Sequence, residues 1–151
     1  MSIRDRVADA ELLWKAGRVE GAWVQALIAA AATARKRYPQ VTSDNQCFKS
    51  FIRDVGETII LGISPPLKGV RFIFADIPFE DIFYNKIRCF LVHEGSLSSD
   101  VVFSESKMVD GNLMGLLKMD TPVVIPDFFC MHLVQAVREA PENQAEFAVP
   151  G

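Results

Sequence analysis

The chain has 151 residues, half of them hydrophobic, and a formal net charge of −3. This length suits one domain with its own core, and the apolar content excludes an intrinsically disordered chain. The negative balance excludes a strongly basic surface that holds nucleic acid by counterion release alone, although it leaves room for a local basic site. We therefore expect a single domain over residues 1–140 and a flexible tail at 141–151.

Three cysteines, Cys47, Cys89 and Cys130, lie far apart in apolar surroundings. Their odd number and wide spacing favour reduced thiols over a disulfide framework, and no pair has the spacing of a zinc site. The most apolar window, 23–34, is shorter than the roughly 20 residues needed to span a bilayer. We expect a cytoplasmic protein that uses no metal and no cofactor and does not contact a membrane.

The N-terminal part of the chain predicts two helices. Charged and apolar residues alternate at helical spacing from Ile3 to about Ala16, and Gly17 offers a turn. A second apolar stripe runs through residues 18–38, where an alanine run adds helix propensity and Pro39 ends the helix. Because small side chains let helices approach closely, we expect these two helices to form an antiparallel pair.

A third helix is predicted over residues 46–61, although Gly56 weakens its second half. The proline and glycine content of residues 62–69 predicts a loop. The short apolar segment 70–74 fits either a strand or a buried loop, and its periodicity does not decide between them.

The second half of the chain predicts a fourth helix over residues 79–93 and then a change of pattern. Apolar residues alternate with period two across residues 100–125, which favours a small antiparallel β element with a hairpin turn at Asp110 and Gly111. A last helix is expected over residues 126–139. The predicted fold class is therefore mainly α, with four to five helices and a small β-hairpin element after the fourth.

The predicted fourth helix carries an arginine and a histidine five residues apart, Arg88 and His93, with Gly95 behind them as a left-handed cap. On a helical wheel both lie opposite the apolar stripe, together with Asn85 and Cys89. An arginine fork binds phosphate, and a histidine exchanges a proton near neutral pH. Two copies of this helix facing each other across a twofold axis would suffice for metal-free cleavage of RNA.

Residues 84–95, YNKIRCFLVHEG, resemble the Arg-x4-6-His signature of HEPN domains, in which a tyrosine often precedes the arginine and a glycine follows the histidine. Four helices with the motif on the fourth also resemble that family's layout, over about residues 3–97. The resemblance implies a homodimer with both motifs in one cleft. It further implies, as in many members, a metal-independent endoribonuclease of a toxin–antitoxin, anti-phage or RNA-processing system.

By this resemblance Arg88 holds the phosphate and stabilises the transition state, and His93 serves as the acid and base. Cys89, a weak hydrogen-bond donor, occupies a position where active members commonly carry asparagine, aspartate or histidine. The expected partners are a second copy of the chain, RNA or a nucleotide, and an antitoxin-like protein. The further residues expected to contact a ligand are Tyr84, Asn85, Cys89 and Glu94.

The residues leave two functions open: the ribonuclease, and a non-catalytic HEPN-like module that binds a nucleotide, an RNA or a protein through its β element. A structural interpretation of the motif pairs Arg88 with Asp81 or Glu94 and places His93 at the helix end, where positive charge is favoured. The three cations at 35–37 allow either contact with RNA phosphate or the ordinary preference for cations in the last turn of a helix.

Overall fold

The protein is described by a computed structural model that covers residues 2–63 and 72–148. Its helices are α1 (Ile3–Lys15), α2 (Val19–Arg37), α3 (Asp44–Asp54), α4 (Gly56–Leu61), α5 (Phe79–Asp81), the π-helices η1 (Ile82–Arg88) and η2 (Phe90–Glu94), α6 (Phe129–Glu139), the 3-10 helix η3 (Pro141–Asn143) and α7 (Gln144–Phe147). Its strands are β1 (Ile73–Phe74), β2 (Ile77–Pro78), β3 (Val101–Ser104), β4 (Lys107–Val109), β5 (Asn112–Met114) and β6 (Val123–Pro126). The described chain is mainly α, as the sequence predicts.

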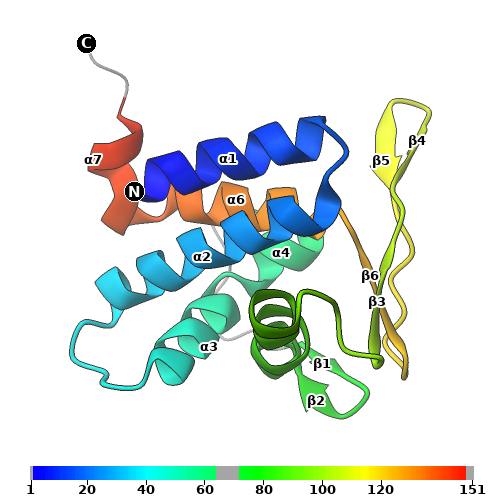
Figure 1. The fold of residues 1–151 in the computed structure, drawn as a ribbon, viewed down its shortest axis with the longest axis horizontal. Coiled ribbons are helices and arrows are strands. Elements are labelled where there is room, and N and C mark those ends of the chain that lie inside the picture. Colours follow the sequence, from blue (N-terminus) through cyan, green and yellow to red (C-terminus); the bar gives the residue numbers. More distant parts are fainter. Residues whose placement is uncertain (1, 64–71, 149–151) are drawn as a thin grey trace.

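Helices α1 and α2 form an antiparallel pair, with α6 packed beside them (Figure 1). Ser2 caps α1, because its hydroxyl accepts the backbone N–H of Asp5 while the Asp5 carboxylate accepts the backbone N–H of Ser2. Gly17, with a φ of +75°, makes the left-handed turn into α2. Five of the seven alanines of α2 are buried, as is Trp23, and α1 packs along α2, so the predicted close pairing of the first two helices is confirmed.

Aromatic rings join this helical layer to the centre of the molecule. The indole of Trp23 stacks on Phe103 of β3 at 4.7 Å between ring centroids and meets Phe83 of η1 at 5.7 Å. Phe83 in turn lies 4.5 Å from Phe79. These contacts seat the helix that begins at Phe79 against α2, and they determine which of its sides faces outward.

The predicted third helix is interrupted. Helix α3 ends at Asp54, Val55 leaves helical geometry with φ −107° and ψ 13°, and Gly56 opens the separate helix α4. Gly56 packs against the ring of Phe72, and glycine has a weak helix propensity, so the break falls where the sequence is least helical. The sequence left residues 70–74 open between a strand and a buried loop. In the structure Ile73 and Phe74 form a strand, and residues 70 and 71 lie outside the described residues. Residues 64–69 of the predicted loop lie outside the described residues.

The helix expected over residues 79–93 is present and runs through α5, η1 and η2 to Glu94, where Gly95 adopts the left-handed conformation with φ +75°. Its hydrogen bonding differs from the expected α pattern: most of its length is π-helical, and the N–H of Cys89 donates to the carbonyl of Tyr84 five residues earlier. π-helical turns are rare in proteins, and those that occur are often found at functional sites. The predicted cap is confirmed and the predicted helical period is wrong.

The β element differs from the single antiparallel hairpin expected over residues 100–125. Strands β3 and β6 pair in parallel, whereas β4 and β5 pair antiparallel across Asp110 and Gly111, both at positive φ. Val101, Val123 and Ile125 are buried, so the parallel pair belongs to the core. The parallel pairing joins segments about twenty residues apart, and local alternation carries no information about such a partner.

The C-terminal region is more ordered than the sequence predicts. The expected last helix starts at Phe129 instead of residue 126, since Pro126 still belongs to β6. Residues 141–147, predicted as part of a flexible tail, form η3 and α7. The reason is a buried anchor: the side-chain N–H groups of Asn143 donate to the hydroxyl of Thr33 at 2.9 Å and to the carbonyl of Val137 at 2.8 Å.

Candidate functional site

Arg88 sits at the end of η1, half-buried, with its guanidinium over two aromatic rings. The guanidinium carbon lies 5.5 Å from the ring centroid of Phe48 and 5.3 Å from that of Tyr84. Phe48 comes from α3 and Tyr84 from the previous turn of η1, so the packing of two elements holds the arginine. Aromatic faces attract a cation and fix its plane without occupying its N–H donors.

No carboxylate neutralises Arg88 within residues 2–63 and 72–148, where it forms neither an ion pair nor a hydrogen bond. The expected pairing with Asp81 is absent, because Asp81 pairs with Lys49 at 3.0 Å between Oδ1 and Nζ. Glu94 is exposed to solvent. The ion-pair interpretation of Arg88 is therefore wrong for the described residues, and its donors remain available to a ligand.

A hollow of about 160 Å³ opens beside Arg88, lined by Ala31, Ala32, Arg35, Asp44 and Arg88. Two alanines leave its α2 wall free of bulk. Some of the donors of Arg35 are already engaged. Its Nε lies 3.4 Å from Oδ1 of Asp44, and its guanidinium donates to the carbonyl of Val41 at 2.7 Å. At roughly 30 Å³ for each water molecule, the hollow has room for a phosphate-sized anion next to the guanidinium of Arg88.

His93 is exposed and lies outside the set of described residues that line the hollow. On a regular α-helix, residues five apart point about 140° away from each other. The π-helical hydrogen bonding of η1 and η2 winds the chain more slowly than an α-helix, which brings Arg88 and His93 nearer to one side of the helix than α geometry would. One chain thus carries both residues on this helix without enclosing them in one pocket.

The remaining predicted site residues differ in their distance from Arg88 and in their exposure to solvent. Tyr84 contacts Arg88 directly and carries Lys49 over its ring at 5.4 Å. Cys89 is half-buried, whereas Asn85 and Glu94 are exposed. Phe48 lies in the predicted third helix, and the sequence analysis did not connect it with Arg88. No local signal could have done so, because the contact depends on how α3 packs against η1.

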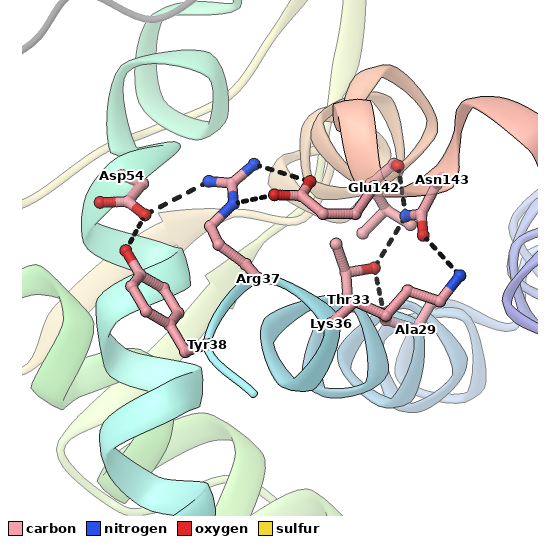
Figure 2. A network of polar contacts seen from close by, with 9 residues as sticks. Ala29, Thr33, Lys36, Arg37, Tyr38, Asp54, Glu142 and Asn143 are labelled. Atoms are coloured by element: carbon pink, nitrogen blue, oxygen red, sulfur yellow. Dashed lines mark hydrogen bonds and ion pairs between the residues drawn. The ribbon is translucent and has the colours of Figure 1, made fainter. Parts of the chain in front are cut away.

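The three cations at 35–37 are bound within the fold, and Figure 2 shows the contacts of Lys36 and Arg37. Arg37 donates through Nε to Glu142 at 2.8 Å and through a terminal nitrogen to Asp54 at 3.3 Å. Lys36 pairs with Glu146 at 2.7 Å. With Arg35 paired to Asp44, the structural interpretation of this cluster accounts for all three side chains.

This network shifts the titration of its members. The hydrogen bond from Arg37 lowers the pKa of Glu142 below its ordinary value. Burial, followed by the hydrogen bond to Asp54, raises the pKa of Tyr38 to about 12. Both shifts keep the charges of the network constant near neutral pH, as suits a structural joint and not an acid–base site.

Other reactive side chains offer no competing centre. Among the described residues no group of His, Cys, Asp and Glu is arranged to hold a metal ion. The three cysteines are free, and burial raises the pKa of Cys130, which keeps its thiol protonated. The Nδ1 of His132 lies 2.7 Å from the carbonyl of Ile59, so this histidine is part of the packing between α4 and α6 and not a solvated surface group.

Comparisons with known proteins add a family to this description. Within the residues described, no helix has both the length and the apolar character needed to cross a membrane. Neither a curated protein nor a solved structure matches the chain. A protein-family model described as Rv1289 matches residues 2–150, which is almost the full length. The chain therefore belongs to the Rv1289 family.

Proposed function

We propose that this protein is a metal-independent endoribonuclease with a HEPN-like helical bundle, in which a dimer combines Arg88 and His93 of both chains. The observation that supports it most is the state of Arg88: half-buried, oriented by two rings, and without a carboxylate partner among the described residues. A guanidinium in this state binds phosphate more strongly than one already paired. Arg37, which has two carboxylate partners, lacks this capacity.

The proposed reaction needs only these two kinds of side chain. The 2′-oxygen of a ribose attacks the adjacent phosphorus, and the bond from phosphorus to the 5′-oxygen of the next nucleotide breaks. A neutral His93 takes the 2′-hydroxyl proton, and the partner's protonated His93 gives a proton to the leaving 5′-oxygen. Arg88 donates to the non-bridging oxygens while their charge develops. The products are a 2′,3′-cyclic phosphate and a 5′-hydroxyl.

The geometry of the helix supports the use of both residues at one phosphate. The π-helical hydrogen bonding of η1 and η2 brings Arg88 and His93 nearer to one side than an α-helix would, which supports contact of one chain with the phosphate and the neighbouring sugar oxygen. The hollow beside Arg88 offers space for an oxygen-rich group without displacing a side chain. A second chain then supplies the second imidazole that the two proton transfers require.

The test is cleavage of a mixed RNA pool in EDTA by the wild type, Arg88→Ala and His93→Ala. The matched control is Arg53→Ala, which removes an exposed arginine of α3 that donates only to Ser50 among the described residues. We expect cyclic-phosphate ends, a loss of at least about 100-fold in rate for the two motif variants, and a control within about twofold of wild type. Equal cleavage by all four proteins, or none by the folded wild type, rejects the proposal.

A second candidate function has its own observation. The β4–β5 hairpin exposes apolar side chains on every residue of both strands except Lys107 and Asn112, which suits a non-catalytic module that binds a protein through this element. Under this function the wild type leaves RNA intact, and substitutions in the hairpin abolish association while Arg88→Ala does not. The two functions therefore differ in the RNA assay before any partner is known.

A further inference from the structure

The apolar surface of the β4–β5 region is a fixed feature of the fold. We call it the hairpin patch, and its side chains are 41% to 67% exposed. At this exposure they present on the order of 600 Å² of accessible surface, divided between the two faces of the hairpin and the residues that follow it. The residues of the hairpin patch are Met108, Val109, Leu113, Met114, Leu116 and Met119.

Both faces of the hairpin are apolar. In the strand register Met108 lies opposite Leu113, so these two point to one side. Val109 lies opposite Asn112 and Lys107 opposite Met114, so Val109 and Met114 point to the other side. A two-stranded hairpin is marginally stable in water by itself, and neither face packs on the core. Such an element calls for a partner that covers it.

The base of the hairpin is held firmly, so its exposure is not the result of fraying. The hydroxyl of Ser104 donates to the carbonyl of Leu116 at 2.8 Å and accepts its N–H at 3.0 Å. Gly115 lies so close to β6 that an added Cβ would sit 2.8 Å from the Cβ of Pro126, which only glycine allows. In Figure 1 the hairpin extends past the β3–β6 pair at the edge of the molecule.

Area and charge favour a second copy of this chain as the occupant. A standard interface buries about 800 Å² on each partner, and two hairpins packed on each other would take part of that area from the hairpin patch and the rest from the residues that flank it. The charges beside it alternate in sign, with Lys107 and Lys118 against Asp110 and Asp120. A strip of mixed sign is complementary to itself across a twofold axis, whereas it selects no strongly basic or acidic partner. The methionines can adapt their shape to this contact.

We infer that the hairpin patch is the interface through which two copies of the chain associate, with the hairpins packed on each other around a twofold axis. This inference goes beyond the proposed function: its observations come from the hairpin alone, and it concerns how two copies associate and not how Arg88 and His93 of two chains meet. The free outer edges of β4 and β5 would also allow the two hairpins to join into one sheet.

The experiment is sedimentation of the full chain without RNA, at protein concentrations up to about 100 μM, where contacts of modest strength are populated. The test variant is Met108→Lys with Leu113→Lys, and the matched control is Leu12→Lys on α1. Leu12 and Met108 are both 67% exposed and Leu113 is 41% exposed, so the control matches the first of the two substitutions in accessibility. We expect a dimer for wild type and Leu12→Lys, and a dissociation constant raised at least about 30-fold in the test variant.

A concentration-dependent Tm in the wild type but not in the test variant would support the same conclusion and shows whether the variant is folded. A wild type that stays monomeric, with the hairpin left for some other protein, overturns the inference, and so does a test variant that dimerises like wild type. Failure here is distinguishable from failure of the ribonuclease proposal. Cleavage by a protein whose dimer survives the hairpin substitutions rejects only the interface, and a hairpin-dependent dimer that leaves RNA intact rejects only the enzyme.

Discussion

The basic end of α2 and the motif helix both carry arginine beside aromatic rings, yet their surroundings differ. Arg37 lies over Phe51 at 5.0 Å and is held by Glu142 and Asp54. Arg88 lies over Phe48 and Tyr84 and has no carboxylate partner in the described parts of the chain. The comparison teaches that charge and aromatic contact alone do not identify a binding residue. The state of the guanidinium donors does.

The two regions also differ in how many segments of the fold contact the arginine. Three distant segments, α2, α3 and η3, meet at Arg37, and Asn143 and Thr33 extend the same polar network into the interior (Figure 2). At Arg88 the contacts come from α3 and η1, and the open side is a hollow. Arg37 should therefore matter for stability and Arg88 for binding, and the following predictions test that division.

The largest effect on stability is expected for Arg37→Ala. Removing this guanidinium leaves Asp54 and Glu142 without their common cation, and we expect the free energy of unfolding to fall by about 3 kcal/mol. Urea unfolding followed by circular dichroism measures it. The control is Arg35→Ala, whose partner Asp44 is 80% exposed, and which should cost less than about 1 kcal/mol. Equal losses of unfolding free energy in the two variants would contradict the larger contribution of Arg37 to stability.

The next effect is expected for Asn143→Ala, which removes a fully buried amide. The carbonyl of Val137 then loses its donor from this side chain, and the hydroxyl of Thr33 loses its donor from Asn143. We expect a loss of about 2 kcal/mol, because two buried hydrogen bonds disappear and the Thr33 hydroxyl loses its donor, while the carbonyl of Val137 keeps the N–H of Ala140 at 3.3 Å. Limited proteolysis should also cut first near residue 141 in this variant. A variant as stable and as resistant as wild type would contradict the anchoring of residues 141–147.

A smaller effect concerns pH. Since Arg37 lowers the pKa of Glu142 in the folded state, this carboxylate contributes stability above its unfolded pKa, and the contribution is lost as pH falls through its folded pKa. Wild type should exceed Glu142→Gln by about 1 kcal/mol at pH 7, and the two should converge as pH falls below the folded pKa of Glu142. Urea melts at several pH values measure the difference. A constant gap between the two proteins would show that the charge of Glu142 is not involved.

The smallest effect on stability is expected for Arg88→Ala. Its contacts in the described chain are two aromatic faces, which are worth less than about 1 kcal/mol at a half-exposed site. The same urea melts measure it. A loss above about 2 kcal/mol would make Arg88 a structural residue like Arg37, and it would weaken the ribonuclease proposal independently of any RNA assay.

The candidate site shows where sequence reasoning succeeds and where it ends. The pair Arg88 and His93 is visible as a local pattern, because residue type and spacing along one helix are properties of the sequence. The hollow lined by Ala31, Arg35 and Asp44 is not visible, because its walls come from α2 and the start of α3. The sequence analysis also did not predict the π-helical turns, because it placed the residues at α-helical spacing and nothing in the local pattern distinguishes an α-helical from a π-helical period.

By itself the sequence determined the mainly α class and the course of the first two helices, with a turn at Gly17 and a left-handed cap at Gly95. These features follow from local periodicity and from the conformational freedom of glycine, which need no distant partner. Only the tertiary structure decided the parallel pairing of β3 with β6, the burial of Asn143, and the difference between Arg37, which is paired, and Arg88, which has no carboxylate partner in the part of the chain that the structure describes. Each of these depends on segments far apart in the chain, whose contacts form only when the whole core packs.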